Sequence, residues 1–228
     1  WDGRIDDGDA EVELDTLSNL TAGDVQPLPA DIPWPVVEVP SGATALGMLT
    51  LDNANPKRCL TAGTYEVTSL ILKRDTELCT VGTVELYITG STLETSADRD
   101  DDEPLRTKVH VDKEAQLYGQ PAGISTTAAG SPYLKQYSPQ DLRIFAVGEG
   151  LVKIGSKDSV TAALIYAPNA KVKTKGGTFL GAIIARRIEV LKDGSAKTKF
   201  VYDNALTSQS IPVGSAADVN IKAWTAVD

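Results

Sequence analysis

The stretch LIYAPNAKVKTKGGTFLGAIIARRIEV, residues 164–190, contains one short pattern twice. LIYAPNAKV at 164–172 is followed, after a Gly-Gly pair, by AIIARRIEV at 182–190. Each copy is rich in small and β-branched apolar residues, which favour strands, and the glycines between them favour a turn. A strand and a turn that recur with a period near twenty residues are typical of a chain that coils and stacks each turn on the one before.

The same period extends in both directions from this stretch. An alignment of three coils brings the turn signals SKDS, KGG and DGS to one place in each coil. The aligned residues are Val152, Val172 and Val190; Leu164, Ile183 and Val201; Tyr166, Ala185 and Asp203; and, in an earlier pair of strands offset by nineteen, Tyr65 and Val67 with Val84 and Leu86. We therefore predict an all-β parallel β-helix, or β-solenoid, with coils of about 19–20 residues. A β-sandwich is the alternative, but its strands would not be expected to repeat a similar sequence at a constant interval.

The rest of the sequence divides around this body. No run keeps a 3.6-residue apolar period, so we expect little helix, and 42% apolar residues suffice for a core. We predict an acidic, proline-rich extended lead-in at 1–40, a solenoid domain at 41–207, and a C-terminal tail at 208–228 that packs on or caps the solenoid. Two loops, 95–105 and 121–140, are expected to be insertions that bulge out of the stack.

The two cysteines, Cys59 and Cys79, are twenty residues apart. Residues one coil apart lie about 4.8 Å from each other in stacked strands, and the Cα atoms of a disulfide lie roughly 4.4–6.8 Å apart. We expect a disulfide, and hence an oxidising compartment; a reduced pair of buried thiols is the alternative. The chain begins at Trp1 in an acidic segment with no signal-like apolar region, so we expect its targeting segment upstream.

Five motifs, in order, resemble a known family: the β-solenoid domain of bacterial surface proteins that carry PilX-like, type IV minor-pilin-like N-termini. The match covers roughly residues 40–207. This resemblance implies a right-handed parallel β-helix that is exported and associated with a pilus or the cell surface, and it implies no catalytic residues. The motifs are Gly63, Thr64 and Tyr65; Leu86, Tyr87, Ile88, Thr89 and Gly90; Tyr166, Ala167, Pro168, Asn169 and Ala170; Gly181, Ala182, Ile183, Ile184 and Ala185; and Tyr202, Asp203, Asn204, Ala205 and Leu206.

Few residues indicate chemistry. The single His110 lies in KVHVDK, where alternation places it on an exposed strand face, and we interpret it as structural. No GxSxG, HExxH, CxxC or phosphate-binding GxxxxGK motif occurs, so we predict no catalytic residues and no cofactor or metal. The first insertion loop is a low-priority candidate for binding Ca²⁺. The candidate partner-binding residues in the two loops are Asp98, Asp100, Asp101, Asp102, Glu103, Tyr133 and Tyr137, with Arg99 and Arg106 beside the acidic run.

The charge of the chain restricts its partners. A net charge of −9 argues against nucleic acid as the default partner, because phosphate binding needs clustered Lys and Arg. One local basic patch does occur: Arg186, Arg187, Lys171, Lys173 and Lys175. We interpret it as a solvated strand face that also protects against edge-to-edge pairing, with contact to DNA or an anionic glycan as the alternative.

From these observations we expect a non-enzymatic, extracellular surface protein that acts in adhesion or pilus assembly. Its partners would be pilus subunits or a cell-surface or host ligand, and we expect no membrane contact by these residues. A carbohydrate-active β-helix enzyme, either a polysaccharide lyase or a hydrolase, is the first alternative, and it predicts a groove with two carboxylates within about 10 Å. A DNA-binding pilus-tip protein is the second alternative, and it predicts a basic stripe.

Overall fold

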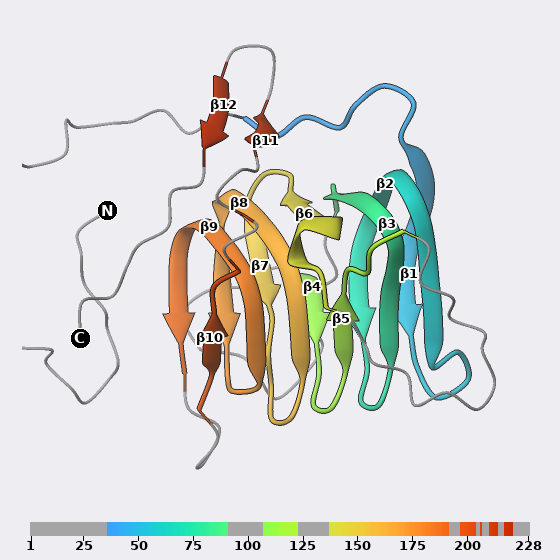
Figure 1. Cartoon of the computed structure of the whole chain (residues 1–228), viewed down its shortest axis with the longest axis vertical. Helices are drawn as coiled ribbons and strands as arrows, with labels where there is room; N and C mark the ends of the chain where they lie inside the picture. Colours follow the sequence, from blue (N-terminus) through green and yellow to red (C-terminus); the bar gives the residue numbers. More distant parts are fainter. Residues whose placement is uncertain are drawn as a thin grey trace, which may run out of the picture.

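The structure is nearly all β, as the sequence predicts. The computed structural model describes residues 36–90, 107–122, 137–191, 197–203, 206, 210–213 and 217–220. Ten strands form one sheet in which every pairing is parallel, and a separate pair of strands is antiparallel. In Figure 1 the strands of the large sheet follow one another across the molecule, from blue at one end to orange at the other.

The large sheet consists of β1 (Thr44–Leu51), β2 (Lys57–Leu72), β3 (Glu77–Ile88), β4 (Thr107–Val111), β5 (Gln116–Tyr118), β6 (Leu142–Ala146), β7 (Gly150–Lys153), β8 (Val160–Thr174), β9 (Thr178–Val190) and β10 (Lys199–Val201). A short 3₁₀ helix, η2 (Pro139–Asp141), precedes β6, and β11 (Ser210–Val213) pairs with β12 (Ala217–Asn220). The 3₁₀ helix begins at the end of the second predicted insertion, 121–140, and ends one residue beyond it.

A long strand of this sheet has several shorter neighbours along one edge. β8 pairs successively with β5, β6 and β7 along its length, and with β9 on its other edge. In the same way β3 pairs with β2 on one edge, and with β5 and then β6 on the other. Each long strand therefore pairs on one edge with the strand before it or after it in sequence, and on the other edge with two or three shorter strands.

The observed register corrects the aligned repeat. Val152 pairs with Val172 as aligned, but Val172 pairs with Ile188, two positions before Val190. The cause is an irregularity in β8 at 167–171, where β8 takes more residues than β9 to cover the same distance. Segments with similar sequences therefore do not pair at the positions where their sequences align.

The other aligned positions also differ from the observed register, and an irregularity between Thr61 and Gly63 in β2 precedes the earlier pair of strands. Leu164 pairs with Ala182 rather than Ile183, Tyr166 with Ile184 rather than Ala185, Val201 with Leu180 rather than Ile183, Tyr65 with Leu86 rather than Val84, and Val67 with Ile88 rather than Leu86.

The core is built from rows, a row being the set of residues paired in register across neighbouring strands. One row runs through six strands, from β1 to β9, and all of its members are aliphatic; five of them are buried, and the last, Ile188 of β9, is 45% exposed. Because successive residues of a strand point to opposite faces, each inward row alternates with an outward one. The members of the six-strand row are Leu49, Leu70, Val109, Val152, Val172 and Ile188.

One outward row is also buried. Tyr87, Phe145 and Tyr166 follow one another in register; the first two rings stack with their centroids 4.6 Å apart, and the last two meet edge to face at 6.4 Å. Val37, from the segment before β1, and Leu206 pack in the same cluster. Residues that precede and residues that follow the large sheet in sequence thus help to cover this face.

Cys59 and Cys79 pair in register between β2 and β3 and form a disulfide, with their Cα atoms 4.4 Å apart. The twenty-residue spacing predicts this bond, because it equals the register offset of the two strands at that point. Tyr118 and Ala162 continue the same row and belong to the same buried cluster as Cys79. The bond therefore joins two neighbouring parallel strands of the large sheet.

Candidate functional site

A row of basic side chains crosses the middle of the large sheet on its outward face. His110 of β4 pairs with Lys153 of β7, which pairs with Lys173 of β8. Neighbouring strands lie about 4.8 Å apart. Three consecutive layers thus place one cationic or titratable side chain each in a single line, which ends at Glu189 of β9.

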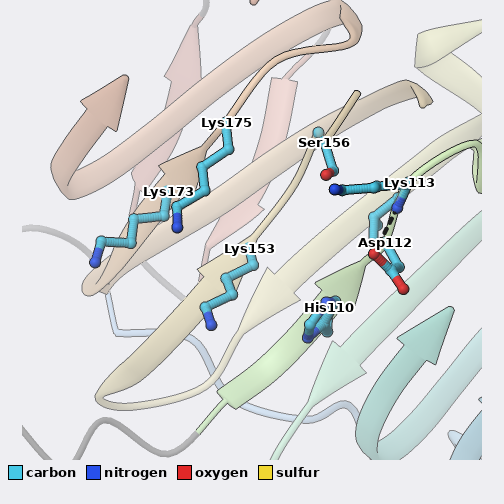
Figure 2. Close-up of a pocket in the computed structure, with 9 residues that line it drawn as sticks. His110, Asp112, Lys113, Lys153, Ser156, Lys173 and Lys175 are labelled. Carbon is cyan, nitrogen blue, oxygen red and sulfur yellow. Dashed lines mark hydrogen bonds between the residues drawn. The ribbon is translucent and has the colours of Figure 1, made fainter. Parts of the chain in front are cut away.

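The chain just beyond these strands adds a second group of polar residues. Because β4, β7 and β8 are parallel, their carboxyl ends lie together, and each is followed by a turn. These turns supply Asp112 and Lys113 after β4, Ser156 after β7, and Lys175 after β8. Together with the basic row they line a pocket of about 210 Å³. Figure 2 shows Lys153 of β7, Lys173 of β8 and Lys175 just beyond β8 on one side of it, and Lys113 with Asp112 on the other.

The turns that form the pocket are held by close backbone contacts. The backbone N–H of Lys175 donates a hydrogen bond to the carbonyl oxygen of Gly155, 3.0 Å away. Gly155 has φ of +76°, and a Cβ there would lie 2.6 Å from the Gly176 carbonyl oxygen, so this close approach of two turns requires glycine. Beside it, the Ser159 hydroxyl bridges the backbone N–H and carbonyl of Ser156, both at 2.7 Å.

The charge of the pocket is opposite to that of the whole chain. Four lysines and His110 line it, against one carboxylate, that of Asp112. Four positive charges less one negative charge give +3 with a neutral histidine, in a chain whose net charge is −9. Such a concentration of like charge in adjacent strands is unfavourable in the absence of counter-charge.

Glu189 supplies counter-charge at one end of the row. Its carboxylate lies 2.6 Å from the Lys171 ammonium, 3.6 Å from that of Lys173, and 3.0 Å from the Arg187 guanidinium. Asp112 lies at the opposite side, where it accepts a hydrogen bond from the backbone N–H of Lys113 at 2.7 Å. The pocket between them can attract a negatively charged group.

A second polar cluster surrounds the disulfide. The Tyr118 hydroxyl donates a hydrogen bond of 2.5 Å to Glu77, whose carboxylate also lies 2.9 Å from the Lys57 ammonium. Burial, followed by the hydrogen bond to Glu77, raises the pKa of Tyr118 well above its usual range. Tyr137 meets the Tyr118 ring edge to face at 5.1 Å, and burial raises its pKa as well. This cluster is satisfied internally and fixes the outer side of the disulfide.

Two sequence interpretations are wrong in detail. His110 is half-buried in the pocket wall and not on an open strand face. Lys173 is buried, with 6% of its surface exposed, and not solvated like Lys175, because it lies between Lys153 and Glu189 of the two neighbouring strands and pairs with the Glu189 carboxylate. Arg186 is exposed as expected.

The sequence interpretation missed Lys153 and Lys113 as members of the site. A signal for Lys153 was present, because the aligned segments VKIG at 152–155 and VKTK at 172–175 place Lys153 and Lys173 in adjacent coils. Lys113 carries no such signal, since its position depends on the insertion between β3 and β4.

The loop candidates are mostly not placed. Asp98, Arg99, Asp100, Asp101, Asp102, Glu103, Arg106 and Tyr133 lie outside the described residues; Tyr137 alone is described, at the disulfide cluster. Within the described ranges no group of three or more His, Cys, Asp or Glu residues could hold a metal ion. The same part of the chain contains no helix long and apolar enough to cross a membrane.

Comparison with known proteins gives one match. The model of a family described as a domain of unknown function, DUF7305, matches residues 39–209, which include the large sheet and the basic pocket. No curated protein and no solved structure matches the chain. Because the match covers most of the sequence, the chain belongs to the DUF7305 family.

Proposed function

We propose that this chain is an exported, non-enzymatic β-solenoid of the bacterial surface that acts in adhesion or in the assembly of a minor-pilin-like structure of a type IV pilus. The body would be a right-handed parallel β-helix whose coils are the successive layers of the large sheet. Its rigidity, rather than any reaction, would be its contribution: a stiff stack holds its outward faces and its insertions at fixed places.

The observation that carries this proposal is the disulfide between two stacked layers. Disulfides persist in oxidising compartments and are rare in reducing ones. Cys79 is buried and its partner lies directly in register, so the bond joins β2 to β3 without disturbing their pairing. The resemblance of five sequence motifs to surface β-solenoids with PilX-like N-termini supports the same location.

The pocket also bears on the enzymatic alternative. A glycoside hydrolase uses a pair of carboxyl groups on either side of the bond that it cleaves. Among the residues that line the pocket, Asp112 is the one carboxylate, and basic side chains make up most of the rest. This lining suits the binding of an anion better than acid–base cleavage by two carboxyl groups.

The test is to locate the full-length protein in the bacterium that produces it. Intact cells are treated with a membrane-impermeant amine-reactive biotin, and pili are sheared off and collected separately. We expect biotin on this protein, its presence in the sheared fraction or the outer surface fraction, and no free thiol after denaturation. A protein that is protected from biotin in intact cells and contains two free thiols would contradict the proposal.

A further inference from the structure

We infer that the free edge of β9 is a docking site for one more strand, and that residues 10–17 of this same chain, AEVELDTL, occupy it. These residues lie outside the described part of the structure. Their pairing would extend the large sheet beyond β9 and close an edge that could otherwise pair with other molecules. The docking does not depend on the cellular location proposed above.

The outer edge of β9 is paired over only its first three residues by the described part of the chain. β8 pairs with β9 from Thr178 to Val190, whereas β10 covers the other edge at Thr178, Phe179 and Leu180 alone. Beyond Leu180, the backbone N–H and C=O groups that point away from β8 have no strand beside them among the described residues. A row of such groups on an edge strand is a template for another strand.

Apolar side chains are concentrated at this end of the sheet. The described residues include six large apolar side chains that are exposed, and four of them are Ile188, Val190, Phe200 and Tyr202, with 37–47% of their surface exposed. Ile188 ends the aliphatic row that begins at Leu49, and every other member of that row is buried. A strand added to β9 would continue the row with one more apolar side chain.

The same end of the sheet is basic. Arg186 and Arg187 of β9 are exposed, as are Lys197 and Lys199 around the start of β10. The single carboxylate of β9, that of Glu189, lies among three basic side chains. Opposite charges on neighbouring strands stabilise their pairing, so this edge favours a strand that carries acidic residues.

Residues 10–17 have the pattern that this edge requires. Apolar and acidic residues alternate there: Ala10, Glu11, Val12, Glu13, Leu14 and Asp15. An extended segment with this pattern is apolar on one face and acidic on the other. Residues 1–35 as a whole contain nine Asp or Glu residues and one Arg, which gives −8 of the −9 of the whole chain. The segment is therefore complementary to the β9 edge in both hydrophobicity and charge.

The first described residues of the chain lie close to this site. Val37 packs in the buried cluster that contains Tyr166 of β8, and Ala182 and Ile184 of β9 pack against the same cluster. In Figure 1 the blue segment before β1 runs above the sheet, from β1 towards the orange strands. The chain that precedes Val37 therefore starts beside β9.

The connection is long enough for docking within one molecule. Residues 18–35 separate the segment from Val36, and these eighteen residues can span about 60 Å when extended. One strand spacing is about 4.8 Å, so the segment reaches β9 without strain. A tethered segment has an effective concentration in the millimolar range. This favours residues 10–17 of the same chain over a second copy of the protein at micromolar concentration.

The test is hydrogen–deuterium exchange of the 228-residue chain, followed by mass spectrometry of its peptides. Two groups of amides should exchange about tenfold or more slowly than an unstructured chain: those of residues 10–17, and those of β9 beyond Leu180 that point away from β8. The variant V12D/L14D should lose this protection in both groups, because it places charges on the apolar face. The matched control V25D/L28D places the same charges outside residues 10–17, and it should keep the protection.

A second pair of variants tests the charge complementarity. R186Q/R187Q should lower the protection of residues 10–17 by about fivefold, since exposed ion pairs contribute modestly to stability. K73Q/R74Q removes the same charge from an exposed basic pair in the turn after β2, and it should leave the protection unchanged. An equal loss in K73Q/R74Q would show general attraction to a basic surface and overturn the inference.

The amides of β3 show whether each variant remains folded, because β3 does not pair with β9. If V12D/L14D loses their protection, the single variant V12D replaces it. Fast exchange of either predicted group in the original chain would overturn the inference. Unchanged protection of β9 in V12D/L14D would assign the edge to other residues. Protection that appears only at concentrations where sedimentation shows a dimer would assign it to a second copy, and would overturn docking within one chain.

Discussion

Reduction of the Cys59–Cys79 bond should lower the stability of the stack without changing its native pairing. Both cysteines stay in register between β2 and β3 whether or not the bond is present, and Cys79 is fully buried beside Tyr118 and Ala162. The effect therefore acts on the unfolded chain, where the bond closes a loop across a sequence separation of twenty residues. Loop-closure entropy for that length is about 3 kcal/mol at 25 °C.

The assay is urea unfolding of the oxidised chain with and without a reductant, followed by circular dichroism. For a denaturant slope of roughly 2 kcal/mol per M, the midpoint should fall by about 1.5 M urea. The double variant C59A/C79A is the control, and its midpoint should not respond to the reductant. The entropic argument for this bond would be refuted if the reductant left the urea midpoint unchanged while a thiol titration showed that both cysteines had been reduced.

Three further predictions concern the faces of the sheet. F145A should destabilise the protein by about 3–5 kcal/mol, because Phe145 is fully buried and stacked on Tyr87. F200A removes a ring that is 47% exposed, so it should lower the stability by less than half as much in the same unfolding assay. G181A should lower the free energy of unfolding by more than about 2 kcal/mol, because Gly181 has φ of +132° and a Cβ would overlap a carbonyl oxygen of β8. G148A is its control: Gly148 has φ of +70° with open space around it, so this variant measures the backbone part of the loss alone. Burial raises the pKa of Tyr87 from 10.0 to about 12, so its contribution to stability is complete below pH 10 and is lost as the pH rises towards 12. Tyrosinate absorbance should show ionisation of this residue at lower pH in the F145A variant, and identical titrations of the two proteins would contradict the burial argument.

The outward rows show which interactions a repeat alignment can anticipate. The disulfide was predictable because the period and the strand spacing together place residues one layer apart within bonding distance. The VKIG and VKTK segments likewise carry the information that Lys153 and Lys173 are neighbours. His110 was interpreted as structural because it is the one histidine of the chain, and its lysine neighbours lie more than forty residues ahead in sequence.

Irregularities in the strands limit how far such an alignment can go. In β8, the segment at 167–171 contains more residues than the part of β9 that faces it, so the pairing beyond it shifts by two positions. Insertions before β4 and before β6 have a similar effect on a larger scale: β2 pairs with β4 at an offset of thirty-nine residues, for example Leu70 with Val109. A period near twenty in the sequence therefore does not give the register of every strand pair.

The sequence by itself determined the strand content and the pairing of the cysteines, because these follow from local propensity and from one constant distance between neighbouring strands. Only the tertiary structure decided the register, the burial of Lys173 and the basic pocket. The register depends on where a strand contains extra residues, because each extra residue shifts the pairing of all residues after it in that strand. The pocket depends on which turns lie side by side after the parallel strands end. The pocket joins residues from 110 to 175 for that reason. The repeat alignment connects Lys153 with Lys173, but no spacing rule in the sequence connects them with His110 or Lys113.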